Sequence, residues 1–250
     1  MKNFTEFNTQ AEQYARFRPN YPEELFVYLK GLCDQTKVAY DVGTGSGQCA
    51  IGLAQYFEKV FASDFSEEQI AKALSQEKIT YFVAPAHESG LLPNSVDIVT
   101  LATSIHWFDL ALFYPEVKRV LKPSGIIAAW AYGFHECENP QITEIINEIG
   151  KGLLLPYWSE PPKLIWNAYQ TLPFPFDELE PPPFEVLSRW NQAQLLGYLS
   201  TWSASQKFEA KHGHHPAQQF MDRLVKAWGD PAETLRFRSP LHLRVGRLNK

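Results

Sequence analysis

The sequence has few cysteines, no long apolar run and no excess of positive charge. Its three cysteines, Cys33, Cys49 and Cys137, are odd in number and far apart. They fit neither a disulfide framework nor a zinc site with closely spaced ligands. No stretch approaches the roughly 18 apolar residues that cross a bilayer, and the first ten residues lack the basic and apolar regions of a signal peptide. We therefore expect a cytoplasmic protein with no metal site and no membrane partner.

The formal net charge is −5, so the protein has no overall positive field. Binding to a phosphate backbone depends on several clustered lysine or arginine side chains. Nucleic acid is therefore not an expected partner. One local group of basic residues keeps an RNA or protein substrate open as an alternative: Arg236, Arg238, Arg244 and Arg247.

The most regular part of the chain lies between Lys37 and Gly125, where short apolar runs alternate with amphipathic stretches. The pattern predicts strands at 38–43, 59–65, 79–85, 95–103 and 125–132. Helices are predicted at 47–57, 66–76, with Ser66 as N-cap, and 111–121. This order is typical of a doubly wound α/β fold with a mostly parallel sheet.

The 18 prolines and 35 aromatic residues (7 Trp, 11 Tyr and 17 Phe) are in excess of average usage, and many lie between Pro156 and Pro183. Proline removes backbone donors, so this stretch is neither regular sheet nor long helix. It is expected to be an irregular wall or lid. Further along, the pattern predicts a strand at 184–190, a helix at 192–203 capped by Asn191, a helix at 216–228 and an edge or antiparallel strand at 241–248.

These elements make one domain, 1–250, with a seven-stranded sheet. We divide it into an N-terminal helical cap (1–36), a cofactor-binding core (37–132), an acceptor-side insertion with irregular and helical structure after the fifth strand (133–235), and a final strand (236–250).

The most informative stretch is the glycine turn DVGTGSGQ, residues 41–48, which joins the first strand to the first helix of the core. Glycines are needed where the chain turns sharply and its backbone approaches a ligand. Asp64 ends the next strand, where a carboxylate can accept hydrogen bonds from the ribose hydroxyls of an adenosine. The turn and this acid together predict an adenosine-containing cofactor.

Two cofactor classes use this geometry. A dinucleotide site normally shows GxGxxG, with the pyrophosphate at the helix N-terminus, whereas this chain has GxGxG preceded by Asp41. A carboxylate at Asp41 would repel pyrophosphate but suits the ammonium group of a methionine moiety. The pattern therefore favours S-adenosylmethionine, with a dinucleotide as the alternative.

The chain resembles class I S-adenosylmethionine-dependent methyltransferases of the type 11 group. The resemblance rests on the glycine turn, SDFS (63–66), LPNSVDIV (92–99) and VLKPSG (120–125). Two further segments, FNTQAEQYARFRPNYPEEL (7–25) and ATSIHWFD (102–109), are similar to the trans-aconitate methyltransferase-like subgroup. In similar proteins the N-terminal segment folds over the cofactor.

Matched position by position, the resemblance implies a set of cofactor-binding residues: Tyr14, Arg18, Asp41, Gly43, Thr44, Gly45, Asp64, Phe65, Ala86, His87 and Thr103. Tyr14 and Arg18 would lie near the methionine carboxylate, or alternatively form a surface helix face. His87 departs from the acid that similar enzymes usually place there. A neutral imidazole can still accept a hydrogen bond from adenine, or the side chain faces solvent.

Methyl transfer from a sulfonium mainly requires the acceptor atom in line and water excluded. His106, after the fourth strand, is the candidate catalytic residue, a base for a hydroxyl or amine acceptor. Acceptor-binding candidates are Trp107 and, from the TWSA segment, Trp202 and Ser203. The alternatives are a packed aromatic corner around His106 and Trp107 and a core role for Trp202.

The expected function is methyl transfer to a small-molecule acceptor, with O-methylation of a carboxylate or hydroxyl favoured. The alternatives are a catalytically silent S-adenosylmethionine-binding subunit and an RNA or protein methyltransferase. The histidines at 212, 214 and 215 lack partners at metal-ligand spacing and are expected in a solvated loop.

Overall fold

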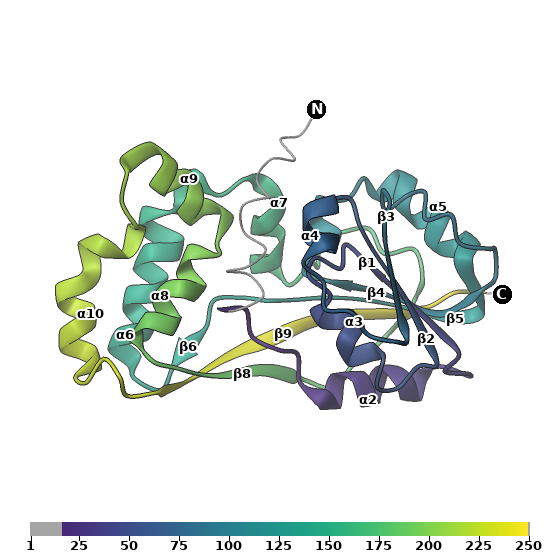
Figure 1. Cartoon of the computed structure of the whole chain (residues 1–250), viewed down its shortest axis with the longest axis horizontal. Coiled ribbons are helices and arrows are strands. Elements are labelled where there is room, and N and C mark those ends of the chain that lie inside the picture. Colours follow the sequence, from purple (N-terminus) through teal and green to yellow (C-terminus); the bar gives the residue numbers. More distant parts are fainter. Residues whose placement is uncertain (1–16, 250) are drawn as a thin grey trace.

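The computed structural model describes residues 17–249, so the predicted cofactor residue Tyr14 lies outside the described residues. Five parallel strands form the core of the sheet in the order β3-β2-β1-β4-β5 (Figure 1). Their bounds are β1 Val38–Val42, β2 Lys59–Asp64, β3 Ile79–Val83, β4 Val96–Ala102 and β5 Leu121–Tyr132. The α/β fold with a mostly parallel sheet is thus confirmed.

Helices cover both faces of this sheet. Buried residues of α2 (Glu23–Leu32) and α3 (Gln48–Leu53) belong to one hydrophobic cluster, and those of α5 (Leu110–Val120) belong to a second. The short helix α4 (Glu67–Ala71) follows β2, and Ser66 caps it by accepting a hydrogen bond from the Gln69 N–H at 3.2 Å, as predicted. Both α3 and α4 end earlier than predicted.

The last strand, β9 (Leu235–Arg247), joins the core to the insertion. Its C-terminal half pairs antiparallel with β5 and with β7 (Asp177–Leu179), and its N-terminal half pairs with β8 (Phe184–Trp190) and β6 (Glu136–Cys137). The sheet therefore has nine strands among the described residues rather than seven. The two extra strands, β6 and β7, are too short to leave a period-2 pattern in the sequence.

The insertion has most of its helices in a layer at the far end of β8 and β9, whereas its short helix Glu160–Lys163 lies nearer the core (Figure 1). It contains α6 (Pro140–Asn147), a π-helical turn Glu148–Leu153, a 3₁₀ turn Leu155–Tyr157, α7 (Glu160–Lys163), a 3₁₀ turn Leu164–Asn167, α8 (Gln192–Ser200), α9 (Ser203–His212), a 3₁₀ turn Pro216–Phe220 and α10 (Met221–Trp228). Asn191 caps α8 in a reciprocal capping box, as predicted. Between Pro156 and Pro183 the chain is irregular, also as predicted, whereas α6 and α9 are additional.

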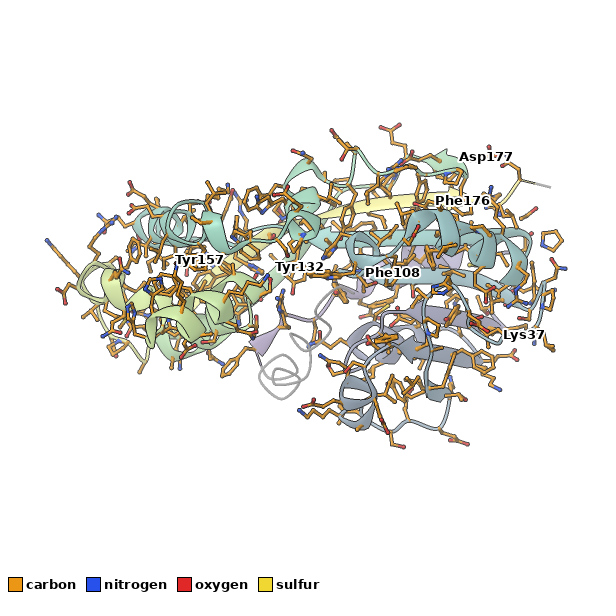
Figure 2. The ribbon with its side chains drawn as sticks, turned by 90° about the horizontal axis from the view of Figure 1, so that it is seen from above. Lys37, Phe108, Tyr132, Tyr157, Phe176 and Asp177 are labelled. Carbon is orange, nitrogen blue, oxygen red and sulfur yellow. The ribbon has the colours of Figure 1, made fainter. Side chains whose placement is uncertain are left out.

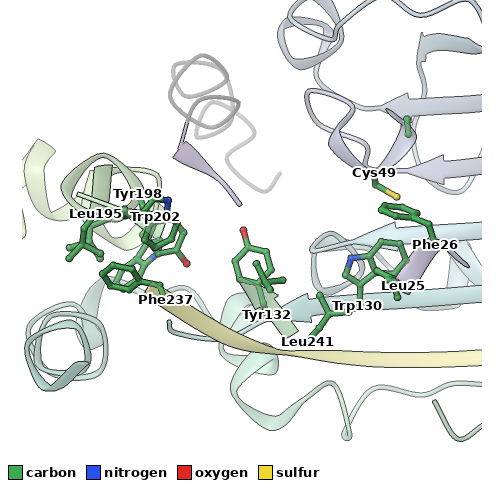
Figure 3. Packing of buried hydrophobic residues seen from close by; sticks show 14 of the residues in the cluster. Leu25, Phe26, Cys49, Trp130, Tyr132, Leu195, Tyr198, Trp202, Phe237 and Leu241 are labelled. Carbon is green, nitrogen blue, oxygen red and sulfur yellow. The ribbon is translucent and has the colours of Figure 1, made fainter. Parts of the chain in front are cut away.

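One hydrophobic cluster extends from the core into the insertion. In Figure 3, Phe26, Cys49 and Trp130 lie at the core end, Tyr132 and Leu241 lie in the middle, and the residues at the insertion end are Leu195, Tyr198, Trp202 and Phe237. Core and insertion thus share a continuous buried face along β9.

Among residues 17–249, no helix has both the length and the apolarity needed to cross a bilayer. In the same range, no group of three or more His, Cys, Asp and Glu side chains is arranged to hold a metal ion.

Candidate functional site

A cavity of about 1160 Å³ opens at the carboxyl ends of the parallel strands and extends under the insertion. Both Phe108 and Tyr132 line it, and in Figure 2 Tyr132 lies between Tyr157 of the insertion and Phe108 of the core. Open α/β sheets bind ligands at this edge. Pockets for a single ligand usually measure about 300–1,000 Å³, so this cavity has room for a cofactor and a second molecule.

The glycine turn forms one wall of the cavity and needs its glycines. Gly43, Gly45 and Gly47 have φ values of +66°, +57° and +88°, a region that disfavours side chains. A Cβ on Gly43 would lie 2.7 Å from Cβ of Ser104, whereas a Cβ on Gly45 would have only the Gln69 side chain near it, at 3.9 Å. The backbone at Gly45 therefore lies open for close approach of a ligand.

Asp64 closes this turn and also faces the cavity. Its Oδ2 accepts a hydrogen bond from the Gly45 N–H and its Oδ1 accepts one from the Ser66 N–H, both at 2.9 Å. Burial raises the pKa of the carboxyl. The neighbouring Phe65 lines the same cavity with 55% of its surface exposed, which suits a flat base lying against its ring.

Asp41 does not face the cavity, contrary to the prediction that it contacts the methionine amino group. It is fully buried, its Oδ2 accepts from the Thr44 hydroxyl at 2.6 Å, and its Oδ1 accepts from the Thr100 hydroxyl at 2.8 Å. Desolvation raises its pKa. A buried carboxylate satisfied by two hydroxyls holds β1, the turn and β4 together, so its role here is to position the turn.

The loop after β4 contributes a strained residue to the cavity. Thr103 has φ +57°, which is costly for a β-branched residue and is characteristic of functional sites. Its N–H donates to the Trp130 carbonyl at 2.7 Å, and its hydroxyl lies 3.3 Å from the Tyr21 hydroxyl. Tyr21 comes from the segment before α2, which also brings Arg18 to the cavity.

Arg18 connects this N-terminal segment to the far wall. Its Nη1 donates to the Tyr132 hydroxyl at 3.2 Å and its Nη2 donates to the Thr201 carbonyl at 3.4 Å. The guanidinium also lies 5.5 Å from the ring centre of Tyr198, within cation–π range. The surface-helix alternative for Arg18 is therefore wrong.

His106 lies in the turn after β4 and lines the cavity. It is 7% exposed, and its Nδ1 lies 2.7 Å from the Tyr169 hydroxyl, whose ring stacks on the imidazole. Burial, aided by the positive charge of Arg18, lowers the pKa of His106 to about 3. The imidazole is therefore neutral at physiological pH and is a weak base.

The loop after β3, which includes Ala86 and His87, is fixed to α5. Glu116 of α5 accepts hydrogen bonds from the Ser89 N–H at 2.9 Å, from the Ser89 hydroxyl, and from Arg119 in a bidentate pair. Burial alone would raise the pKa of Glu116, but the hydrogen bonds from Arg119 and Ser89 lower it to about 2.

The insertion supplies an aromatic wall. Trp202 is buried in the hydrophobic cluster and also lines the cavity, so its core and pocket roles coexist. Ser203, the first residue of α9, lines the cavity beside it.

Most of the predicted site residues meet in this cavity: Arg18, Gly43, Thr44, Gly45, Asp64, Phe65, Ala86, His87, Thr103, His106, Trp107, Trp202 and Ser203. Their individual roles stay predictions. Sequence reasoning missed another group of lining residues: Tyr21, Gln48, Phe108, Tyr132, Phe134, Trp158, Trp166 and Tyr198. The unusual density of aromatic residues after β5 was the available signal for several of them.

The chain is similar to known methyltransferases. Residues 40–129 match the family described as Methyltransferase domain. A protein of Dictyostelium discoideum that carries a methyltransferase name is 30% identical over 229 residues, which cover 89% of this chain and 86% of that protein. The structure of a protein from Anaeromyxobacter dehalogenans, titled as a type II methyltransferase, is 41% identical, has a TM-score of 0.87 and covers 94% of this chain and 100% of its own.

The protein CRG1 of Saccharomyces cerevisiae, which carries the name of an S-adenosylmethionine-dependent methyltransferase, is similar over a shorter range. It is 30% identical over 137 residues, which cover 50% of this chain and 46% of the yeast protein. The chain thus spans about half the length of that relative.

Proposed function

The chain belongs to the S-adenosylmethionine-dependent methyltransferases, and we propose that it methylates the carboxylate of a small-molecule acceptor. Its residues fit the cofactor. The open backbone at Gly45, the inward carboxylate of Asp64 and the exposed ring of Phe65 offer contacts for a methionyl chain, a ribose and an adenine. When bound, S-adenosylmethionine supplies an electrophilic methyl group.

The observation that carries the proposal is the state of His106. A general base works best with a pKa near the operating pH, and a buried imidazole with a pKa of about 3 is far from it. A hydroxyl or ammonium acceptor would react faster with such a base, whereas a carboxylate is already ionised at pH 7. His106 and its partner Tyr169 then serve to position the acceptor and exclude water.

One basic side chain of the cavity, Arg18, also favours an anionic acceptor. Arg18 reaches the junction of core and insertion, where it faces the rings of Tyr132 and Tyr198. An arginine there can pair with the carboxylate of the acceptor, in place of the methionine carboxylate that the resemblance implied. This agrees with the sequence resemblance to the trans-aconitate methyltransferase-like subgroup, which we retain as part of the proposal.

The basic group near the C-terminus gives little support to an RNA substrate. Arg236, Arg238 and Arg244 pair with Glu138, Glu136 and Glu178, and Arg247 donates to two backbone carbonyls. These arginines serve the strands around β9, so a small molecule is the favoured acceptor.

The test is incubation of the purified protein with methyl-labelled S-adenosylmethionine and a panel of small carboxylic acids, alcohols and amines. We expect label in a product that mild alkali hydrolyses, as a methyl ester is and an ether or N-methyl group is not. Label only in alkali-stable products would overturn the carboxylate assignment. Binding of S-adenosylhomocysteine without transfer to any compound of the panel would favour a catalytically silent subunit.

A further inference from the structure

Four rings from the insertion meet at the acceptor half of the cavity, and we call them the aromatic box: Phe134, Trp158, Trp166 and Trp202. The Phe134 ring centre lies 6.2 Å from Trp158, 6.0 Å from Trp166 and 5.0 Å from Trp202. Trp158 lies 6.3 Å from Trp166 and 5.8 Å from Trp202. Each ring therefore contacts at least two of the others.

The box is held in place by the π-helical turn Glu148–Leu153. The Trp158 indole N–H donates to the Gly150 carbonyl at 2.8 Å. A Cβ on Gly150 would lie 2.6 Å from the Phe134 ring and 3.1 Å from the Trp202 ring. Only glycine at this position lets the rings approach so closely, so the box is preorganised rather than assembled by a ligand.

Aromatic boxes take either flat rings or cations, and the charges around this one decide between them. Among the described lining residues, those between Tyr132 and Ser203 carry no acidic side chain. Two positive charges already lie close by. The Lys151 ammonium is 5.4 Å from the Phe134 ring centre, and Arg18 lies over Tyr198, whose ring centre is 5.7 Å from that of Trp202. A cationic ligand would meet repulsion without a counter-charge.

The exposure of Trp166 indicates where a ligand would bury the most aromatic surface. It is 37% exposed although it lines the cavity, and a flat ring lying against it would remove that surface from water. A ring ligand would also gain edge or stacking contacts that a saturated body of equal size lacks.

We propose that the acceptor carries a flat aromatic or conjugated ring that lies against the exposed Trp166 side of the aromatic box, with its carboxylate directed toward Arg18. The carboxylate part rests on the proposed function, whereas the ring part rests on the box alone.

The test is calorimetric titration of the protein saturated with S-adenosylhomocysteine, which requires no methyl transfer. The probes are cinnamate, its saturated counterpart 3-cyclohexylpropanoate, and tetramethylammonium. We expect cinnamate to bind at least about tenfold more tightly than the saturated acid, with no measurable binding of tetramethylammonium. Equal affinity for the two acids, no binding of cinnamate, or tighter binding of the cation would overturn the proposal.

The variant Trp166→Leu tests whether the box causes this preference, because a partly exposed ring can be replaced with little effect on folding. It should reduce the preference for cinnamate to below about threefold, whereas Leu155→Ala, in the same segment but away from the cavity lining, should leave it unchanged. An unaltered preference in Trp166→Leu, with circular dichroism like that of the wild type, would contradict the assignment. A ring preference that persists when no carboxylate is methylated would refute only the proposed reaction.

Discussion

The carboxylate of Asp64 is expected to act on both the cofactor and the turn that holds it. In Asp64→Ala the ribose loses its acceptor and the Gly45 and Ser66 N–H groups lose theirs. Hydrogen bonds to a charged group contribute about 1.5–3 kcal/mol, so loss of the ribose contacts should weaken S-adenosylhomocysteine binding by about 10- to 150-fold. Calorimetric titration measures this directly.

The same substitution should also lower the free energy of unfolding. The two freed N–H groups border an open cavity and can bind water instead. The loss should therefore lie near the lower end of the range of about 1.5–3 kcal/mol. Urea denaturation measures this loss, and Asp177→Ala, on exposed β7 far from the cavity (Figure 2), is the matched control. A dissociation constant within about twofold of the wild type in a folded Asp64→Ala protein would refute the reasoning, because this range predicts at least a tenfold change.

Three further predictions concern His106, Glu116 and Gly47. His106→Ala should mainly raise the KM of a confirmed carboxylate acceptor, whereas a fall in kcat of about 100-fold would indicate that His106 acts as a base. In the wild type, kcat/KM should show no inflection near pH 6.5, because the pKa of His106 is about 3. The pKa of Glu116 is lowered from 4.5 to about 2, so its contribution to stability is fully present above pH 4.5 and is lost as the pH falls toward 2. The difference in melting temperature between the wild type and Glu116→Gln should therefore shrink from pH 6 to pH 3, and a constant difference would contradict this. Gly47→Ala puts a Cβ against the Tyr81 hydroxyl at φ +88° and should destabilise the protein by about 1–3 kcal/mol in urea denaturation. Gly31→Ala, with open space around it, should instead stabilise the protein slightly, and equal effects of the two substitutions would contradict the packing described.

The core strands were predictable because each is a short apolar run between helices, and parallel strands buried on both faces must be apolar throughout. Caps were predictable for a similar reason, since Ser66 and Asn191 carry their signal locally. Helix α4 ends early because its predicted last turn has no core to cover, and Leu74 there is 68% exposed.

Helix α6 was missed although its signal is regular. Asn139 and Pro140 are a good helix start, and Ile142, Ile145 and Ile146 recur at helical spacing and are buried. Helix α9 has no comparable pattern, because most of its residues are polar and only Ala204, Ser205 and Phe208 are buried. It is held by tertiary packing, which the local sequence does not encode.

The site residues divide in the same way. Asp64, Thr103 and His106 lie at or just after the ends of parallel strands, and the topology brings these ends together at one edge of the sheet, as predicted. Spacing does not reveal on which side of the turn a carboxylate lies, and Asp41 proved to point into the interior. The pKa of His106 depends on burial by Tyr169 and the insertion, segments far away in the sequence.

Strand β9 determines which parts of this molecule can move independently. One continuous backbone of 13 residues is hydrogen-bonded to the core at one end and to the insertion at the other, as its path across Figure 1 shows. Rotation of the insertion relative to the core would have to bend or break this strand, so the aromatic wall keeps a fixed distance from the glycine turn. Entry of an acceptor must then depend on segments that are not paired to β9, such as α7, and evolution can change the acceptor pocket there without disturbing the cofactor site.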